Sequence, residues 1–304
     1  MTKPLLAAIE GGGTKFVCAL GNAQTVLASA RIETRDAIAT LADVAAFFAR
    51  ATAEHGQPQA LGLACFGPLD LDPRSPGYGR LGQSCPKPGW EGFDLLAGVQ
   101  AFLPCPASIE TDVNAAAFAE AQVGAARGRD PVAYVTVGTG IGIGVVSGGK
   151  PVHGLGHPEG GHIYTRRHPA HGDFPGVCPA HGDCIEGLAS GPAFAASWGM
   201  PADALPEDHP AWAVEADYLG QICANLTLIM APQKIVLGGG VMHRTHLYPM
   251  VRERTLHWLG GFIPRLADDP AEIERLVVPP GCKAAPGLVG AFLLAESLIG
   301  ARQG

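Results

Sequence analysis

Three glycine-rich segments, each placed directly after a short apolar run, constrain the fold of this chain more than any other feature. They read EGGGTK at residues 10–15, VGTGIGIG at 137–144 and LGGGV at 237–241. A short apolar run bounded by glycine is typical of a buried strand that ends in a tight turn. Consecutive glycines also let backbone N–H groups approach an anion closely. Each segment alone could be an ordinary turn, but the three together indicate a protein that binds phosphate.

The three segments differ in what accompanies the glycines. Thr14 and Lys15 add a hydroxyl and a cation to the first segment, and Thr139 adds a hydroxyl to the second. The first segment lacks the spacing of the common phosphate-binding loop, and an apparent strand follows it, so a plain hairpin turn remains the alternative. The third segment precedes an apparent helix, which is a suitable place for a nucleotide base or ribose.

The pattern of apolar residues predicts an α/β protein. We expect strands within residues 5–32, 60–66, 107–112, 134–152 and 234–241, and helices at residues 40–55, 93–103, 113–126, 184–198, 213–230 and 287–299. Groups of strands that alternate with helices in each half of the chain are typical of α/β architecture. The proline- and glycine-rich stretch at 67–90 predicts a long irregular connection, and such connections usually have a function. We expect two lobes, residues 1–115 and 116–304, with the last helix packing back on the first lobe.

The charge and the apolar pattern of the chain argue against nucleic acid as a partner and against a membrane or secreted location. The formal net charge of -7 leaves no basic surface for nucleic acid. The apolar run at the start of the chain is too short for a membrane span or a signal peptide, so a cytoplasmic protein is expected. The cysteines that stand alone in apolar contexts are expected to be buried free thiols, in keeping with a reducing compartment. They are Cys18, Cys65, Cys85, Cys105, Cys223 and Cys282.

Asp112 is the main catalytic candidate. It follows an apparent strand and precedes an alanine-rich helix, in the sequence IETDVN at residues 109–114. The simplest interpretation is a carboxylate that caps the helix, worth about 1 kcal/mol. The same carboxylate could also accept the proton of a sugar hydroxyl that attacks a γ-phosphate. The two roles are compatible.

A cluster of cysteine and histidine indicates a metal site. Cys178, His181 and Cys184 are spaced closely enough to bind one ion, but a closed tetrahedral site needs a fourth ligand. In a reducing compartment a metal is favoured over the alternative, a disulfide between Cys178 and Cys184. The spacing leaves the choice of fourth ligand open among His153, His157, His162, His168 and His171.

Taken in order along the chain, these features resemble the ROK family of sugar kinases, within the actin/hexokinase-like ATPase superfamily, and bacterial fructokinases in particular. The resemblance covers essentially the whole chain. It is carried by IEGGGTKFVCALG, CFGPLDLDPRSPGYG, PKPGW, ETDVNAAAFAE, GHPEGGHI and CPAHGDCIEGLASGPA.

The resemblance implies two ribonuclease-H-like lobes with MgATP in a cleft between them. Asp112 matches the catalytic base, and Glu10 stands where many relatives carry an aspartate that holds hydrated Mg²⁺. The residues that match the phosphate and adenosine loops are Gly12, Gly13, Thr14, Lys15, Gly138, Thr139, Gly140, Gly238, Gly239 and Gly240.

The resemblance also implies the remaining ligands. His162 would complete a structural Zn²⁺ site with Cys178, His181 and Cys184. The residues that match sugar-contacting positions are Thr111, Asp112, Glu159, His162 and Glu186. Thr111 stands where glucokinase-type members usually have asparagine, which argues against glucose.

The function expected from the resemblance is ATP-dependent phosphorylation of a hexose by a homodimer, with the 6-hydroxyl of D-fructose as the favoured acceptor. Mannose, glucose and other hexoses are the alternatives. A sugar-sensing regulator is disfavoured, because regulators of the family carry a DNA-binding extension before the first glycine loop, which begins here at residue 10.

Overall fold

A computed structural model describes residues 4–300, which form two compact units. Unit 1 comprises the described residues up to Ala119, the segment Pro151–His157 and the described residues from Cys282 onward. Unit 2 comprises Glu120–Lys150 and Pro158–Gly281. A single boundary at residue 115 would let the chain cross from one unit to the other once. The chain instead crosses after Ala119, Lys150, His157 and Gly281. Among residues 4–300, no helix combines the length and the apolar composition needed to cross a membrane.

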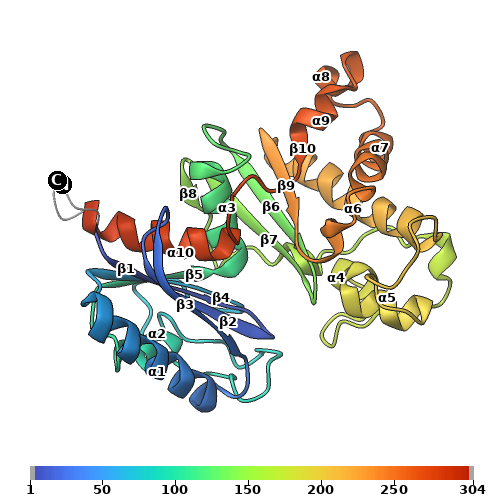
Figure 1. The fold of residues 1–304 in the computed structure, drawn as a ribbon. Coiled ribbons are helices and arrows are strands. Elements are labelled where there is room, and N and C mark those ends of the chain that lie inside the picture. The colour runs from blue at the N-terminus through green and yellow to red at the C-terminus, as the bar shows by residue number, and fades with distance from the viewer. Residues whose placement is uncertain (1–3, 301–304) are drawn as a thin grey trace. The chain divides into compact units, whose positions relative to one another are not determined.

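Each unit contains a five-stranded sheet, and the two sheets have the same topology (Figure 1). The order in unit 1 is β3-β2-β1-β4-β5, and the order in unit 2 is β10-β9-β6-β7-β8. β1 pairs antiparallel with β2 and parallel with β4, while β6 pairs antiparallel with β7 and parallel with β9. The α/β fold expected from the sequence is confirmed.

The strands of unit 1 are β1 (Leu6–Gly11), β2 (Lys15–Gly21), β3 (Val26–Glu33), β4 (Ala60–Cys65) and β5 (Ala107–Thr111). Its helices are α1 (Ala37–His55), α2 (Leu95–Gln100), α3 (Asp112–Val123), which continues into unit 2, and α10 (Pro286–Gly300). The strands of unit 2 are β6 (Val132–Val137), β7 (Ile141–Ser147), β8 (Lys150–Pro151), which ends in unit 1, β9 (Lys234–Gly238) and β10 (Val277–Val278). Its α-helices are α4 (Ile185–Ala189), α5 (Gly191–Trp198), α6 (Ala211–Met230), α7 (Leu247–Leu259), α8 (Pro264–Asp268) and α9 (Glu272–Leu276), and short 3₁₀ turns lie at Gly160–His162, Pro169–His171 and Val241–His243.

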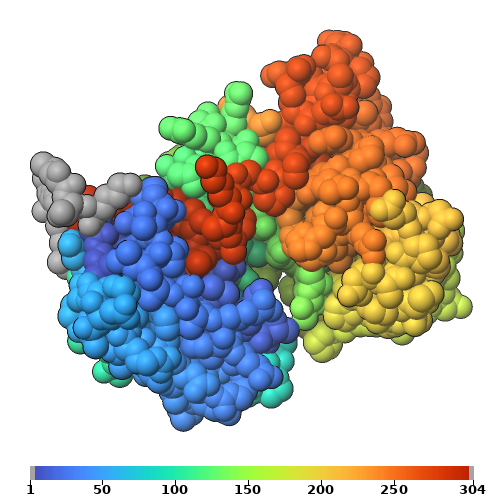
Figure 2. Space-filling model, in the orientation of Figure 1, coloured from blue at the N-terminus to red at the C-terminus, as the bar shows by residue number. Residues whose placement is uncertain are grey.

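The sheet of unit 1 is covered by helices on both faces. Successive residues of a strand face opposite sides, so Ala7 and Ile9 pack in the core formed with α1 and α2, while Leu6 and Ala8 pack in the core formed with α10. Figure 2 shows the outer surface of α1 as the blue atoms low on the visible face. A Cβ atom at Gly62 would overlap the carbonyl of Ala291 in α10. Glycine at that position therefore allows α10 to lie directly on β4.

The segment 67–90 is irregular, as predicted, and a buried aromatic residue holds its end in place. The Trp90 ring is fully buried and stacks on Phe16 with 5.3 Å between the ring centroids. Its indole N–H donates a 2.7 Å hydrogen bond to the carbonyl of Arg35. Both the apolar body and the polar atom of this side chain are therefore satisfied.

The single helix expected at 184–198 is wrong, because the structure has two helices there, α4 and α5. Ser190 between them is extended, with φ −75° and ψ 164°. Pro192 has no backbone N–H with which to continue the first helix. The N–H of Gly191 instead donates a 2.7 Å hydrogen bond to the carbonyl of Gly138. The interruption thus attaches this region to the second glycine loop.

Candidate functional site

In unit 1, the first glycine loop and Asp112 lie at one edge of the sheet. Strands β1, β4 and β5 are parallel, and their register aligns Gly11 with Cys65 and Cys65 with Thr111. The carboxyl ends of parallel strands meet at the same edge of a sheet, where α/β proteins commonly bind ligands. The register therefore places the start of the loop and the turn before Asp112 in one row.

The first glycine loop is a hairpin turn with an exposed tip. The N–H of Gly12 donates to the carbonyl of Lys15 over 2.8 Å, which closes the turn. The Thr34 hydroxyl donates to the carbonyl of Gly12 over 2.8 Å. Gly13 and Thr14 are exposed. The hairpin that the sequence left as an alternative is present, and it leaves the tip of the loop accessible to an anion.

The negative charge of Asp112 affects the protonation of Glu10 at this edge. The pKa of Glu10 is raised to about 7, first by burial and then by the negative charge of Asp112, while Lys15 and the N–H of Leu288 oppose the shift. Two carboxylates that repel each other disfavour the doubly ionised state. A bound divalent cation would remove that repulsion, and oxygen ligands of this kind suit Mg²⁺.

Asp112 is the first residue of α3, but the helix is capped by its neighbour. The hydroxyl of Thr111 accepts a 3.2 Å hydrogen bond from the N–H of Asn114, which is the usual geometry of an N-cap. The Asp112 carboxylate accepts from the N–H of Val113 over 2.9 Å. The expectation that Asp112 caps this helix is therefore wrong. Thr111, which is only 3% exposed, has that role.

Glu110 was not identified from the sequence, yet it organises the turn that carries Asp112. Its carboxylate accepts hydrogen bonds from the N–H of Thr111 over 2.8 Å and from the side-chain amide of Asn114 over 3.1 Å. The other carboxylate oxygen lies 2.6 Å from Nε2 of His153. The signal in the sequence was a carboxylate within a short strand that carries no other charged residue.

In unit 2, the second and third glycine loops lie side by side. β6 and β9 are parallel and align Thr136 with Gly238, so the loops that follow them share an edge. Gly239 has φ 90°, and a Cβ there would overlap the backbone of Val137. Only glycine fits such a position. Thr139 is exposed, as a residue that contacts a ligand should be.

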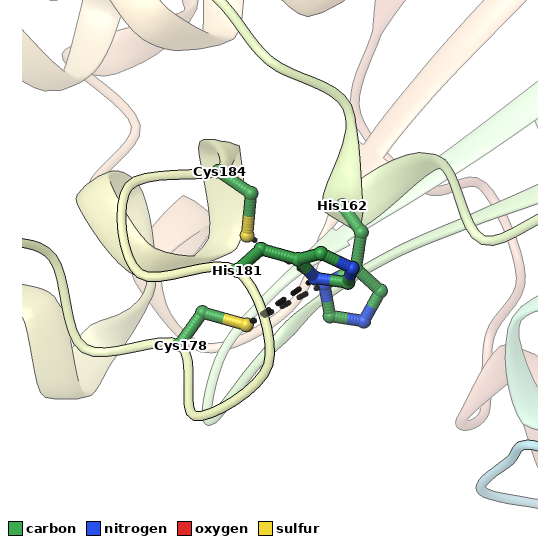
Figure 3. A group of neighbouring side chains, drawn as sticks. All are labelled: His162, Cys178, His181 and Cys184. Atoms are coloured by element: carbon green, nitrogen blue, oxygen red, sulfur yellow. Dashed lines mark hydrogen bonds between the residues drawn. The ribbon is translucent and has the colours of Figure 1, made fainter. Parts of the chain in front are cut away.

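Four side chains of unit 2 converge in the pattern of a metal site (Figure 3). The ligand atoms of His162, Cys178, His181 and Cys184 all lie within 4.8 Å of one another. Sγ of Cys178 is 3.7 Å from Nδ1 of both His162 and His181, and Sγ of Cys184 is 3.6 Å from Nδ1 of His162. Zn–S and Zn–N bonds of roughly 2.3 and 2.0 Å in a tetrahedron require S···N separations of about 3.6 Å. The four residues therefore fit Zn²⁺.

The other candidate histidines have different partners. His153 contacts Glu110, Nε2 of His157 accepts from the N–H of Leu69, and Nδ1 of His168 accepts from the N–H of Ala170. His171 lies 2.9 Å from the hydroxyl of Tyr218. Cys178 and Cys184 are free thiols rather than a disulfide. Burial raises the pKa of Cys184 to about 11, so the binding of a metal to its thiolate would release a proton.

The ROK family model matches residues 6–297, nearly the whole chain. The chain belongs to the ROK family. Among curated relatives, the fructokinase of Zymomonas mobilis is 41% identical, covering 96% of this chain and 97% of its own. The fructokinase of Pediococcus pentosaceus is 38% identical, covering 97% of this chain and 99% of its own. The ROK hexokinase of Thermus thermophilus superposes with a TM-score of 0.74 at 26% identity, covering 99% of this chain and 100% of that one.

The ROK glucokinase of Streptomyces griseus, solved with glucose and AMPPNP, shares the fold with a TM-score of 0.75 at 24% identity, over 96% of this chain and 99% of that one. The two-lobed fold of the hexokinase type is thereby confirmed. In this ROK protein, the glutamates expected near the sugar lie close in sequence to the cluster of His162, Cys178, His181 and Cys184. Glu159 is exposed and directly precedes the turn that ends at His162, and Glu186 lies at the start of α4.

Proposed function

We propose that this ROK protein is an ATP-dependent fructokinase that transfers the γ-phosphoryl group to the 6-hydroxyl of D-fructose. Its membership of a sugar-kinase family and its similarity to fructokinases over nearly its full length support this assignment. Mannose, glucose and other hexoses remain the alternative acceptors, because related sugars differ only in the placement of hydroxyl groups.

The observation that carries the proposal is the position of Asp112. It lies at the sheet edge beside the first glycine loop, and its charge is felt by Glu10. We propose that its carboxylate orients the sugar hydroxyl and accepts its proton as the bond to phosphorus forms.

The glycine loops are proposed to bind ATP. Backbone N–H groups of Gly12, Gly13, Gly138 and Gly140, the hydroxyls of Thr14 and Thr139, and the Lys15 ammonium would contact phosphate oxygens. Gly238, Gly239 and Gly240 would contact the adenosine. Glu10 would hold hydrated Mg²⁺, which neutralises phosphate charge when it is bound. The repulsion between Glu10 and Asp112 supports a cation at this place.

The four-residue cluster is proposed to hold structural Zn²⁺, because four protein ligands leave no open position for catalysis. Glu159, His162 and Glu186 would contact sugar hydroxyls from the segments that the metal fastens. Thr111, which caps α3 next to Asp112, is proposed to lie at the sugar-binding site. The free thiols of the lone cysteines are consistent with the proposed cytoplasmic location, and a homodimer is proposed from the family resemblance alone.

The test combines one variant with a panel of sugars. ATP turnover is measured with fructose, mannose, glucose and N-acetylmannosamine, for the parent and for Asp112→Asn. Fructose should give the highest kcat/KM, and Asp112→Asn should lower kcat by about 10²- to 10⁴-fold with ATP binding preserved. Near-normal turnover by Asp112→Asn would rule out the base. Binding of a sugar without turnover of any of the four would favour a sugar-sensing regulator.

A further inference from the structure

The carboxylate of Glu110 joins two parts of unit 1 that are far apart in the sequence. Glu110 is 2% exposed and lies on β5, two residues before Asp112. One carboxylate oxygen accepts from the N–H of Thr111 and from the amide of Asn114, the residues that flank Asp112 in the turn. The other oxygen meets His153, which lies in the segment Pro151–His157.

The contact between His153 and Glu110 has the character of a short ion pair. Nε2 of His153 lies 2.6 Å from Oε2 of Glu110, and 40% of the histidine side chain remains exposed. The hydrogen bond to Glu110 raises the pKa of His153, which favours the protonated imidazole. Charge-assisted hydrogen bonds of this kind are stronger than neutral ones.

The segment that carries His153 is also fixed at a second point. Nε2 of His157 accepts a 3.0 Å hydrogen bond from the N–H of Leu69, near the start of the irregular segment 67–90. The imidazole of His153 is therefore presented to Glu110 by a backbone that is attached to the same unit. The next residues along the chain lead to Glu159.

We propose that His153 is a positioning residue for Asp112 that acts through Glu110. The proposal rests on the role of Asp112 as the base in the function proposed above. His153 holds the Glu110 carboxylate in place, directed at the turn. Glu110 in turn fixes the N–H of Thr111 and the amide of Asn114, and so the backbone between them from which Asp112 projects.

The physical reason is the burial of Glu110. A buried carboxylate that loses its cationic partner is destabilised, and it then takes up a proton or turns toward solvent. Either response weakens the hydrogen bonds that it accepts from Thr111 and Asn114. A shift of about 1 Å in a catalytic group can lower the rate by about 10²-fold.

A double-mutant cycle on the whole protein tests the coupling. We compare kcat of the parent, His153→Ala, Asp112→Asn and the double variant, using the sugar that the parent turns over fastest. His153→Ala should lower kcat by about 10- to 100-fold in the parent. In the Asp112→Asn background it should change kcat little, because residues that act as a unit are not additive. His153→Gln, which retains a neutral N–H donor, should keep more of the parental kcat than His153→Ala.

The control is His257→Ala on α7, an exposed histidine in unit 2, which should keep the parental kcat. Equal fold-losses from His153→Ala in both backgrounds, or no loss in the parent, would overturn the proposal. If Asp112 is not the catalytic base, the result is different, because Asp112→Asn alone would then retain the parental turnover. If His153→Ala does not fold, the cycle is run with His153→Gln. Its smaller loss of kcat in the parent must then be absent when the same substitution is made in Asp112→Asn.

Discussion

Glu186 holds the start of β7, since its Oε2 accepts a 3.0 Å hydrogen bond from the backbone N–H of Ile141. Ile141 directly follows Gly140 of the second glycine loop, and Glu186 lies two residues after Cys184 of the metal cluster. A Cβ at Gly140 would lie only 2.5 Å from the same carboxylate oxygen. Within unit 2, one side chain therefore connects the Cys/His cluster proposed to bind zinc with a loop proposed to bind phosphate.

Two substitutions at Glu186 separate its structural role from its proposed contact with sugar. Glu186→Ala leaves the N–H of Ile141 without this acceptor and should lower the free energy of unfolding by about 1–3 kcal/mol. It should also raise the KM for both ATP and sugar. Glu186→Gln keeps an acceptor oxygen, so stability and the KM for ATP should stay near parental values while the KM for sugar rises. Urea unfolding measures the stability and steady-state kinetics measure the two KM values. An unchanged KM for ATP in Glu186→Ala would contradict the idea that Glu186 supports the second glycine loop through Ile141.

Removal of the proposed zinc should loosen the segments that carry Glu159 and Glu186. Cys184→Ser should lose the metal in elemental analysis, lower the Tm and raise the KM for sugar, because a structural zinc contributes directly to folding. ATP binding should be weakened but not abolished, because the glycine loops themselves remain. The matched control is Cys105→Ser, which changes a partly buried lone cysteine of unit 1. A metal-free preparation with an unchanged KM for sugar would refute the link between metal and substrate.

Gly287 in the first turn of α10 is predicted to set the position of Glu10. A Cβ at Gly287 would lie 2.8 Å from Cδ of Glu10, whose carboxylate accepts from the N–H of Leu288. Alanine is favoured over glycine in a helix by about 1 kcal/mol, so Gly287→Ala need not lower the Tm. It should nevertheless raise the Mg²⁺ concentration needed for half-maximal activity and lower kcat.

Gly300→Ala in the same helix is the control for Gly287→Ala, because among the described residues no atom comes within 4 Å of a Cβ at that position. Mg²⁺ dependence is followed both by turnover and by MgATP binding in the absence of sugar. Parental Mg²⁺ dependence in Gly287→Ala would show that Glu10 tolerates the displacement.

The contact between His153 and Glu110 predicts a dependence of stability on pH. The folded state raises the pKa of His153, so its contribution to stability is complete below the unfolded value of about 6.5 and is lost as pH rises through the raised pKa. Tyr78 is the other titratable group that senses Glu110, and its pKa is raised mainly by burial. In the parent, the contribution of His153 to the free energy of unfolding is present at pH 6 and lost by pH 9. His153→Gln should remove this contribution, so the free energy of unfolding, measured with urea, should fall less between pH 6 and pH 9 than it does in the parent. An unchanged difference would mean that His153 does not titrate against Glu110.

Much of the fold could be predicted from local sequence patterns. The short apolar runs of β1, β6 and β9 and the glycines in or just after their ends are local features, so the sequence shows them directly. The spacing of Cys178, His181 and Cys184 is equally local. The division of 184–198 into two helices was missed, because the bond from Gly191 to Gly138 that accompanies it is not local.

The sequence by itself determined the α/β class, the three glycine loops, the position of Asp112 after a strand and, from spacing alone, three of the four residues of the Cys/His cluster. The spacing left the fourth residue open and the family resemblance named His162, which the tertiary structure brings to the other three. Only the tertiary structure decided that Thr111 rather than Asp112 caps α3, and which side chains brace the site. The contacts of Glu110 with His153 and of Ile141 with Glu186 join residues 43 and 45 positions apart. Such pairs depend on strand register and on the packing of whole segments, which no short pattern in a single sequence records.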